Sequence, residues 1–414
     1  MIGALKPRLG LMMLLQYFIW GCWYVTLGTW LAGLHFSGQQ IGWVAGTTAV
    51  GALVSPFFVG LIADRASATQ RLLAGLHLLG AALLWLASLQ SSFVKLYLTV
   101  LLYSLCYMPT LALTSSLAMR HVADPKQEFG MVRVFGTLGW IVAGLAIGAS
   151  GVEATAIPMR VAAAASLIMS LYCLTLPDTP PLARGSDFKW QHVIPFESLR
   201  LLRRRPIAVF ALASLLICIP LQFYYAFTNL YLNEIGIHNA AGKMTAGQMS
   251  ELFCMLLIPW FFRRLGVKYM LGVGMLAWAV RYGLFAFGNG GALLWMLWLG
   301  IILHGICFDF FFVVGQIYID REAPATLRAA TQGLITFITY GAGMFVGAWL
   351  SGIVVDAHAL VGAHGAVTHD WRSIWLVAGI FAAIVMVLFL LTFSDEESDA
   401  IDGAARKARG GQNR

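Results

Sequence analysis

Charged residues are scarce in this 414-residue chain. Asp, Glu, Lys and Arg together make up 11% of it, against about 25% in soluble globular proteins. Hydrophobic residues reach 59%, and the mean hydropathy is +0.78. This composition excludes an ordinary soluble enzyme or binding domain and indicates an integral membrane protein. The net charge of +8 comes from short loops between apolar runs, so it does not indicate nucleic-acid binding.

Signatures of energy-consuming or catalytic chemistry are also missing. No Gly-x-x-x-x-Gly-Lys-Ser/Thr motif occurs, which argues against an ATP-driven pump. The six cysteines all fall in apolar segments without paired or metal-ligand spacing, so we interpret them as small apolar core residues. With no nucleophile–base pair or ligand cluster evident, we expect no enzyme activity, no cofactor and no metal.

Long apolar runs dominate what is present. At about 20 residues per membrane-crossing helix, hydropathy predicts an all-α integral membrane protein with twelve spans. They lie near 10–34, 40–62, 72–90, 94–118, 130–150, 156–177, 207–232, 244–265, 269–287, 292–318, 328–355 and 371–393. The first run is too long for a signal-peptide core and is expected to be retained.

The basic residues predict how the chain is oriented. With both termini in the cytoplasm, 21 of the 27 Lys and Arg residues lie in inside loops and tails or at the span ends beside them, and two, Arg133 and Arg281, lie within spans. The remaining four lie in outside loops: Lys95, Arg160, Lys243 and Arg372. Because Lys and Arg accumulate on the cytoplasmic side, this bias supports twelve spans with both ends inside.

A polar interval divides the chain in the middle. Residues 178–206 contain four prolines and a basic cluster, which predicts a cytoplasmic linker between two six-helix bundles, 1–177 and 207–393. Residues 394–414 mix both charges with glycine and are predicted to be a disordered cytoplasmic tail. Transporters of the major facilitator type have this plan, with the substrate site between the halves near mid-membrane.

Ionisable residues within spans are the strongest candidates for function, because a charge at the bilayer centre costs about 2.5–3.5 kcal/mol on insertion scales. Gln248 and Glu251 are three residues apart on one helix face and are too polar to face lipid. We interpret them as a substrate or proton site, with an interhelical hydrogen-bond pair as the alternative.

The ninth and tenth spans add a second polar group. Arg281 and Asp309 lie at similar depths on consecutive antiparallel spans, which makes an ion pair plausible. The pair is either structural or a proton-coupled switch in which protonation of Asp309 releases Arg281. His304 and Phe308 share a face of the tenth span at a spacing of four.

The fifth and seventh spans combine polar and aromatic residues. Arg133, Thr137 and Trp140 recur at spacings of four and three, and Gln222 and Tyr225 are three apart. Such faces suit a planar ligand with hydroxyl groups, because aromatic side chains stack on its plane and amide groups form hydrogen bonds with its edge. For Trp140, ordinary packing is an equally good interpretation.

Two sets of motifs resemble known families. Gly60-Leu-Ile-Ala-Asp64-Arg65 resembles the loop motif of the major facilitator superfamily, which implies a gating role for Asp64 and Arg65; an ordinary capped loop is the alternative. A more specific set resembles the nucleoside:proton symporter family, the bacterial nucleoside permeases. Its elements are Gln16-Tyr17-x-x-Trp20-Gly21, Tyr107-Met108-Pro109-Thr110, Arg133-x-x-Gly136-Thr137-x-Gly139, Gln248-x-x-Glu251, Trp278-x-x-Arg281 and Phe308-Asp309-Phe310-Phe311.

That resemblance implies a nucleoside site and names its residues. The matching positions are Arg133, Thr137, Gln222, Gln248, Glu251, Phe308 and Asp309. Three positions depart from the family pattern: Trp140 replaces a Phe, Tyr225 an Asn and His304 a Tyr. The substrate-contacting set thus comprises Arg133, Thr137, Trp140, Gln222, Tyr225, Gln248, Glu251, His304 and Phe308, and proton coupling is assigned to Glu251, Asp309 and Arg281.

These observations together predict a proton-coupled secondary transporter that imports nucleosides by alternating access. It is expected to be a monomer in the inner (cytoplasmic) membrane, with nucleoside, protons and lipid as its partners and no nucleic acid. A proton-coupled sugar or glycoside symporter of the same fold is the nearest alternative, since Trp stacking and a carboxylate on hydroxyls also suit a pyranose. A transport-dead sensor or scaffold is a more distant one.

Overall fold

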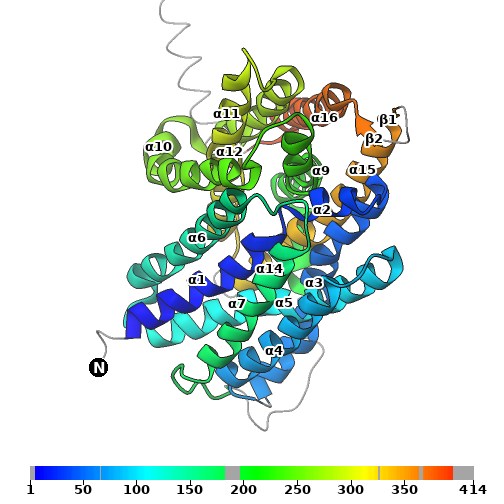
Figure 1. Ribbon diagram of the computed structural model, residues 1–414. Helices are drawn as coiled ribbons and strands as arrows, with labels where there is room; N and C mark the ends of the chain where they lie inside the picture. The colour runs from blue at the N-terminus through cyan, green and yellow to red at the C-terminus, as the bar shows by residue number, and fades with distance from the viewer. Residues whose placement is uncertain (1–4, 66, 182–195, 325–326, 363–366, 395–414) are drawn as a thin grey trace, which may run out of the picture. The chain divides into compact units, whose positions relative to one another are not determined.

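The computed structural model describes residues 5–65, 67–181, 196–324, 327–362 and 367–394, without the side chains at 56–65, 126–127, 196–197 and 329. Its elements (Figure 1) are α1 Leu5–Trp23, α2 Leu27–Gly33, α3 Gly38–Arg65, α4 Thr69–Ala87, α5 Phe93–His121, α6 Pro125–Ser150, α7 Ile157–Cys173, α8 Phe196–Leu199, η3 Arg200–Arg203, α9 Arg205–Glu234, α10 Ala240–Phe287, α11 Leu294–Ile302, α12 His304–Phe308, η4 Asp309–Val313, α13 Val314–Glu322, α14 Arg328–Thr336, η5 Phe337–Gly343, α15 Met344–Ala357, β1 Ala359–Val361, β2 Val367–His369 and α16 Trp371–Thr392.

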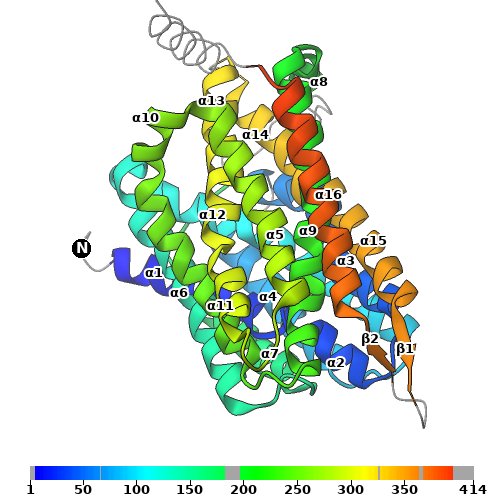
Figure 2. The same ribbon diagram turned by 90° about the horizontal axis from the view of Figure 1, so that it is seen from above.

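The helices follow the predicted apolar runs because lipid forces a spanning backbone to satisfy its own hydrogen bonds. Nine helical stretches of the described chain are long and apolar enough to cross a membrane, and some of them join consecutive elements, as Leu5–Gly33 joins α1 and α2. One of them, α10, covers two predicted spans and turns at Gly266, whose φ is 66° (Figure 2). The all-α membrane fold is confirmed below, whereas the exact number of twelve spans stays a prediction.

The surface of the helices is as apolar as a lipid-facing surface must be. On α16, Ile384, Leu388 and Leu391 are 52%, 53% and 76% exposed. Polar side chains such as Gln16 and His77 are buried instead, and His77 Nε2 lies 3.0 Å from Gln16 Oε1. Exposed leucine and buried glutamine are the arrangement expected when the surrounding solvent is hydrocarbon.

Several spans contain irregular turns. The first is interrupted at residues 24–26, between α1 and α2. The tenth consists of α11, α12, the π-helical turn η4 and α13, and the eleventh contains the π-helical turn η5. A π-helical turn adds a residue to the helix and rotates every following side chain. Helical periodicity counted from sequence therefore fails across η4, where Asp309 lies.

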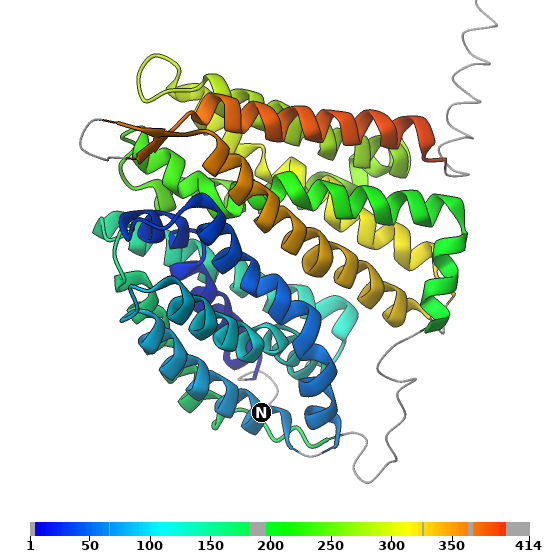
Figure 3. The ribbon, with the colours of Figure 1, turned by 90° about the vertical axis from the view of Figure 1, so that its right-hand side faces the viewer.

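The chain divides into two compact units, each described by itself. The first comprises 1–193, 222–245 and 340–368, and so combines most of the N-terminal half with two later segments. Within it α1 packs along α6, α4 along α7, and α3 against both α5 and α15 (Figure 1). The strands β1 and β2 pair just beyond α15 (Figure 3). The predicted division of the chain at 178–206 stays a prediction.

The second unit comprises 194–221, 246–339 and 369–414. Its core is aromatic: the rings of Tyr282 and Trp375 are stacked at 5.5 Å, and Phe311 packs edge-on to Trp278 at 5.8 Å. These rings hold the helices that carry Arg281 and Asp309.

Candidate functional site

An aromatic cluster lies on the first helix in the first unit. The Trp20 ring lies 5.4 Å from Trp140 on α6, 5.5 Å from Tyr24 and 6.2 Å from Tyr107 on α5. We call Tyr17, Trp20, Tyr24 and Trp140 the Trp20 cluster. In this cluster Trp140 packs against other aromatic rings. That position agrees with both interpretations of Trp140, a ligand-contacting residue or an ordinary packing residue.

Arg133 adds a positive charge at the edge of this cluster. Its guanidinium carbon lies 4.1 Å from the centre of the Tyr17 ring, a geometry that stabilises the cation by about 0.5–2 kcal/mol. Gly136 makes room for this pair, because a Cβ there would lie 2.7 Å from both Arg133 Nη1 and Tyr17 Cδ2. Arg133, Thr137 and Trp140 are all half-buried, as residues on one accessible face would be.

Gln222 and Tyr225 of α9 join the same cluster through Tyr24. Gln222 Nε2 donates to Tyr24 Oη at 3.4 Å, and the Tyr24 and Tyr225 rings are 5.8 Å apart. Gln222 Oε1 is buried and has no hydrogen-bond partner within the described part of the chain. A buried amide oxygen without a donor is costly, so this atom is well placed to accept from a ligand.

Trp20 and Tyr24 were missed as site residues by sequence reasoning. Trp20 was noted only as part of a family motif. The signal was nevertheless present, because Tyr17, Trp20 and Tyr24 recur at spacings of three and four on one face of the first span.

A second group, in the second unit, contains the ionisable residues. Glu251 Oε1 lies 2.9 Å from His304 Nε2, and Arg281 Nη1 lies 2.8 Å from His304 Nδ1. Arg281 and His304 are fully buried, whereas the Glu251 side chain is 18% exposed. We call Glu251, His304, Arg281 and Asp309 the acid–base cluster. His304 thus lies between the cation and the carboxylate.

Other predicted residues surround this cluster. Gln248 is 8% exposed, one helical turn before Glu251, and the Phe308 ring lies 5.9 Å from His304. The structure thus brings Glu251, His304 and Phe308 together. The side chains of Asp64 and Arg65, predicted to act in gating, lie outside the described residues.

The suggested ion pair between Arg281 and Asp309 is not formed in this structure. Asp309 is 1% exposed, and neither of its carboxylate oxygens has a hydrogen-bond partner among the residues described. Arg281 contacts His304 instead. The physical reason is that the buried His304 ring, rather than the Asp309 carboxylate, lies against the Arg281 guanidinium, with Nδ1 2.8 Å from Nη1.

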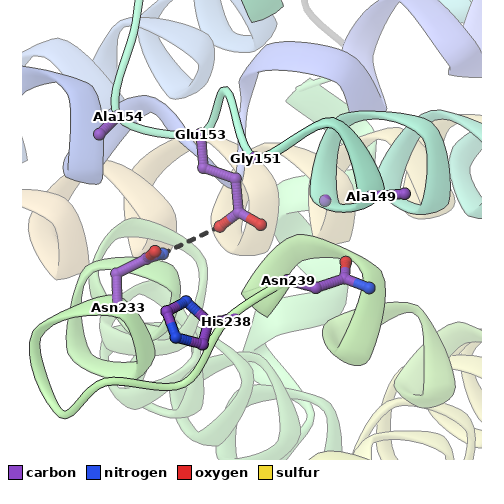
Figure 4. A pocket seen from close by; sticks show the side chains of 8 residues that line it. Ala149, Gly151, Glu153, Ala154, Asn233, His238 and Asn239 are labelled. Atoms are coloured by element: carbon purple, nitrogen blue, oxygen red, sulfur yellow. Dashed lines mark hydrogen bonds between the residues drawn. The ribbon is translucent and has the colours of Figure 1, made fainter.

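A separate cavity of about 510 Å³ lies in the first unit, at the ends of α6 and α9. Figure 4 shows Glu153 pointing into it and accepting a hydrogen bond from Asn233, with His238 and Asn239 nearby. Sequence reasoning missed Glu153, because a carboxylate in a loop is normally solvated. In the described chain, no group of three or more His, Cys, Asp or Glu residues is arranged to hold a metal ion.

Comparison with known proteins gives consistent results. A family profile described as nucleoside H+ symporter matches residues 4–398. YegT of Escherichia coli is 40% identical over 407 residues, covering 95% of each chain, and the xanthosine permease of Escherichia coli is 32% identical over 94% of this chain and 96% of its own. The crystal structure of nucleoside transporter NupG has a TM-score of 0.86 at 29% identity, covering 95% of this chain and all of that one.

These similarities confirm the major facilitator fold and the expected class of transporter rather than enzyme. The profile covers almost the whole chain, including both groups of site residues. The chain belongs to the nucleoside H+ symporter family.

Proposed function

We propose that this protein imports nucleosides across the cytoplasmic (inner) membrane and drives their accumulation with protons entering by alternating access. It acts as a monomer with both termini in the cytoplasm. The family match supports nucleoside and proton as the two substrates, and the bias of basic residues supports the orientation. The single observation that carries the mechanism is Asp309, a buried carboxylate whose oxygens lack hydrogen-bond partners in the described chain.

The Trp20 cluster, with Arg133, Thr137, Gln222 and Tyr225, is assigned to nucleoside recognition. Stacking on an aromatic ring contributes about 1–3 kcal/mol per base and tolerates different bases. Gln222 Oε1 supplies an acceptor for an N–H group of the base, whereas Thr137 supplies a hydroxyl.

The acid–base cluster, with Gln248 and Phe308, is assigned to ribose binding and proton coupling. A carboxylate accepts hydrogen bonds from vicinal hydroxyls, which makes Glu251 the ribose-contacting group. An ionised Asp309 without partners costs several kcal/mol, and a proton removes that cost. Proton binding at Asp309 therefore changes the energy of the helix bundle and shifts it between its two states. Gating by Asp64 and Arg65 stays a prediction from the loop motif.

Tyr24→Phe is expected to raise the KM for nucleoside uptake about three- to tenfold with little change in the maximal rate. The substitution removes the hydroxyl that accepts from Gln222, and losing one such hydrogen bond costs about 0.5–1.5 kcal/mol. Initial uptake rates at varied nucleoside concentration measure the effect. Tyr97→Phe on α5 is the matched control, and an unchanged KM in Tyr24→Phe would remove Tyr24 from the site.

The function itself is tested by uptake of labelled uridine, adenosine and xanthosine in cells that lack their own nucleoside transporters. Accumulation is expected above the external concentration, and a protonophore is expected to abolish it because the proton gradient is the energy source. Competition by unlabelled sugars separates a nucleoside carrier from the sugar symporter considered above. Strong competition by a sugar, without any nucleoside accumulation, would reject the proposal.

A further inference from the structure

Two carboxylates bind the backbone of distant helices at one end of the first unit. That unit contains 1–193 together with 222–245 and 340–368, so segments from both halves of the chain are packed within it. We propose that Glu153 and Asp356 form two latches that hold the halves together on the outer side and must release before the transporter opens outward. The inference rests on the proposed function only in assuming alternating access.

The first latch is Glu153, in the loop that follows α6. The residue is 4% exposed, and both of its carboxylate oxygens are occupied. Oε1 accepts from the backbone N–H of Ala241 at 3.0 Å, and Oε2 accepts from the side-chain amides of Asn229 at 2.8 Å and Asn233 at 2.9 Å. All three donors belong to the C-terminal half, in α9 and the first turn of α10.

Helix geometry explains why this contact is strong. The first four N–H groups of a helix have no partner inside the helix, and the helix dipole places partial positive charge there. The Glu153 carboxylate at the start of α10 accepts a hydrogen bond from one of these N–H groups, and its negative charge also interacts favourably with the helix dipole. Hydrogen bonds to a charged acceptor are roughly twice as strong as neutral ones.

Asn229 extends the first latch to a third element. Its Oδ1 accepts from Thr29 Oγ1 of α2 at 2.5 Å, while its Nδ2 donates to Glu153. Gly28, next to Thr29, allows α2 to approach α9 this closely, because a Cβ there would overlap the carbonyl oxygen of Ala226. One asparagine of the C-terminal half thus joins two elements of the N-terminal half.

The second latch repeats the first with the halves exchanged. Asp356 lies in the last turn of α15, in the C-terminal half. Its two oxygens accept from the backbone N–H groups of Gly38 and Gln39, which begin α3 in the N-terminal half. In a chain of two six-helix repeats, α6 corresponds to α15 and α10 to α3. The two contacts are therefore equivalent under the pseudo-two-fold relation of such transporters.

Glycines stand beside each latch in the same arrangement. On α6, a Cβ at Gly148 would overlap the backbone nitrogen of Gly242, in the first turn of α10. On α3, a Cβ at Gly42 would overlap the carbonyl oxygen of Ala348 on α15. Small residues let the helix backbones touch. At the end of each such helix contact, the latch carboxylate accepts hydrogen bonds from the backbone of the opposite helix.

Both latches lie at the ends of the chain segments that face outward in the proposed orientation. The loops after α2, α6, α9 and α15 all belong to the set poor in Lys and Arg. The cavity beside Glu153 (Figure 4) leaves room for the Glu153 side chain to move away from its donors and for water to replace it there. Released N–H and amide groups are then hydrated instead of left unpaired, which makes the latch reversible.

Release is measured by labelling an introduced cysteine with a membrane-impermeant maleimide in intact cells. Thr245→Cys reports on the first latch, because Thr245 is 2% exposed and packs against Gly144 of α6. Glu153→Gln is expected to raise its labelling rate roughly tenfold, as loss of a charged hydrogen-bonded group predicts. The glutamine carries an NH2 group that must face one of the three donors.

The second latch is tested in the same way. Ala348→Cys, at a position 1% exposed against Gly42, is combined with Asp356→Asn and is expected to show a similar increase. Asp370→Asn is the matched control, because Asp370 also accepts from a helix N-terminus: the backbone N–H of Ser373, in the first turn of α16, donates to it at 3.2 Å. It is expected to leave both labelling rates unchanged.

The possible outcomes distinguish failure of the latch proposal from failure of the proposed function. Unchanged labelling in both latch variants, or an equal increase in Asp370→Asn, would overturn the inference. Each variant is first checked for the parent's elution profile in detergent, and the chain without a reporter cysteine provides the background. Because labelling needs no nucleoside, faster labelling in a protein that accumulates no nucleoside would support the latches and reject the proposed function.

Discussion

Asp309→Asn is expected to abolish concentrative nucleoside uptake and leave at most equilibration across the membrane. Asp309 is 1% exposed, with no hydrogen-bond partner for its carboxylate in the described chain. Asparagine has nearly the same shape but cannot bind and release a proton, so the energetic link between proton entry and the two states of the bundle is lost. Steady-state accumulation of labelled nucleoside under an imposed pH gradient should fall by at least about tenfold.

Glu251→Gln is expected to impair accumulation as well, because it removes the negative charge 2.9 Å from His304. Counterflow with nucleoside on both sides distinguishes loss of coupling from loss of binding, since exchange needs no net proton movement. Asp320→Asn, an exposed aspartate on α13, is the matched control and should transport normally. Normal accumulation by both Asp309→Asn and Glu251→Gln would refute proton coupling through these carboxylates.

Gly139→Val is expected to reduce the amount of folded protein severely. A Cβ at Gly139 of α6 would overlap the carbonyl oxygen and main chain of Leu14 on α1. The valine must push apart two helices that pack along much of their length, and overpacking of this kind costs about 1–3 kcal/mol or more. Thermal unfolding in detergent, followed by size-exclusion chromatography, should show a lower midpoint and a lower yield.

Gly130→Val provides the control on the same helix. Nothing lies within 4 Å of a Cβ built at Gly130, so the same change in chemistry meets no backbone there. Its yield and unfolding midpoint should match those of the parent. Equal stability of the two variants would mean that α1 and α6 do not pack as closely as described.

Local features of the chain were sufficient to predict its helices. The predicted apolar runs coincide with helices of the described chain to within several residues, because lipid acts on each segment independently and demands apolar surface and internal hydrogen bonding. The spacing of Gln248 and Glu251 placed both on one face for the same local reason. Family motifs then identified the class of transporter, which the profile match confirms.

Contacts between segments far apart in the sequence could not be predicted from these local features. Sequence alone does not show that Gly148 of α6 lies against the first turn of α10, or that Gly352 of α15 lies against the first turn of α3. Glu153 was overlooked because a loop carboxylate is indistinguishable in sequence from a solvated one. Its donors lie 76 to 88 residues further along the chain, and only packing brings them within reach.

The acid–base cluster shows the same limit at atomic scale. Sequence identified Arg281, Asp309 and Glu251 among the charged residues within the membrane, with His304 as a neutral companion, because a charge in hydrocarbon is too costly to be there without a role. Which of them touch was decided by tertiary structure: Arg281 contacts His304, and the Asp309 carboxylate has no hydrogen-bond partner in the described chain. Hydropathy and periodicity report the energy of one segment in lipid, whereas pairing depends on how two segments cross and where a helix departs from regularity.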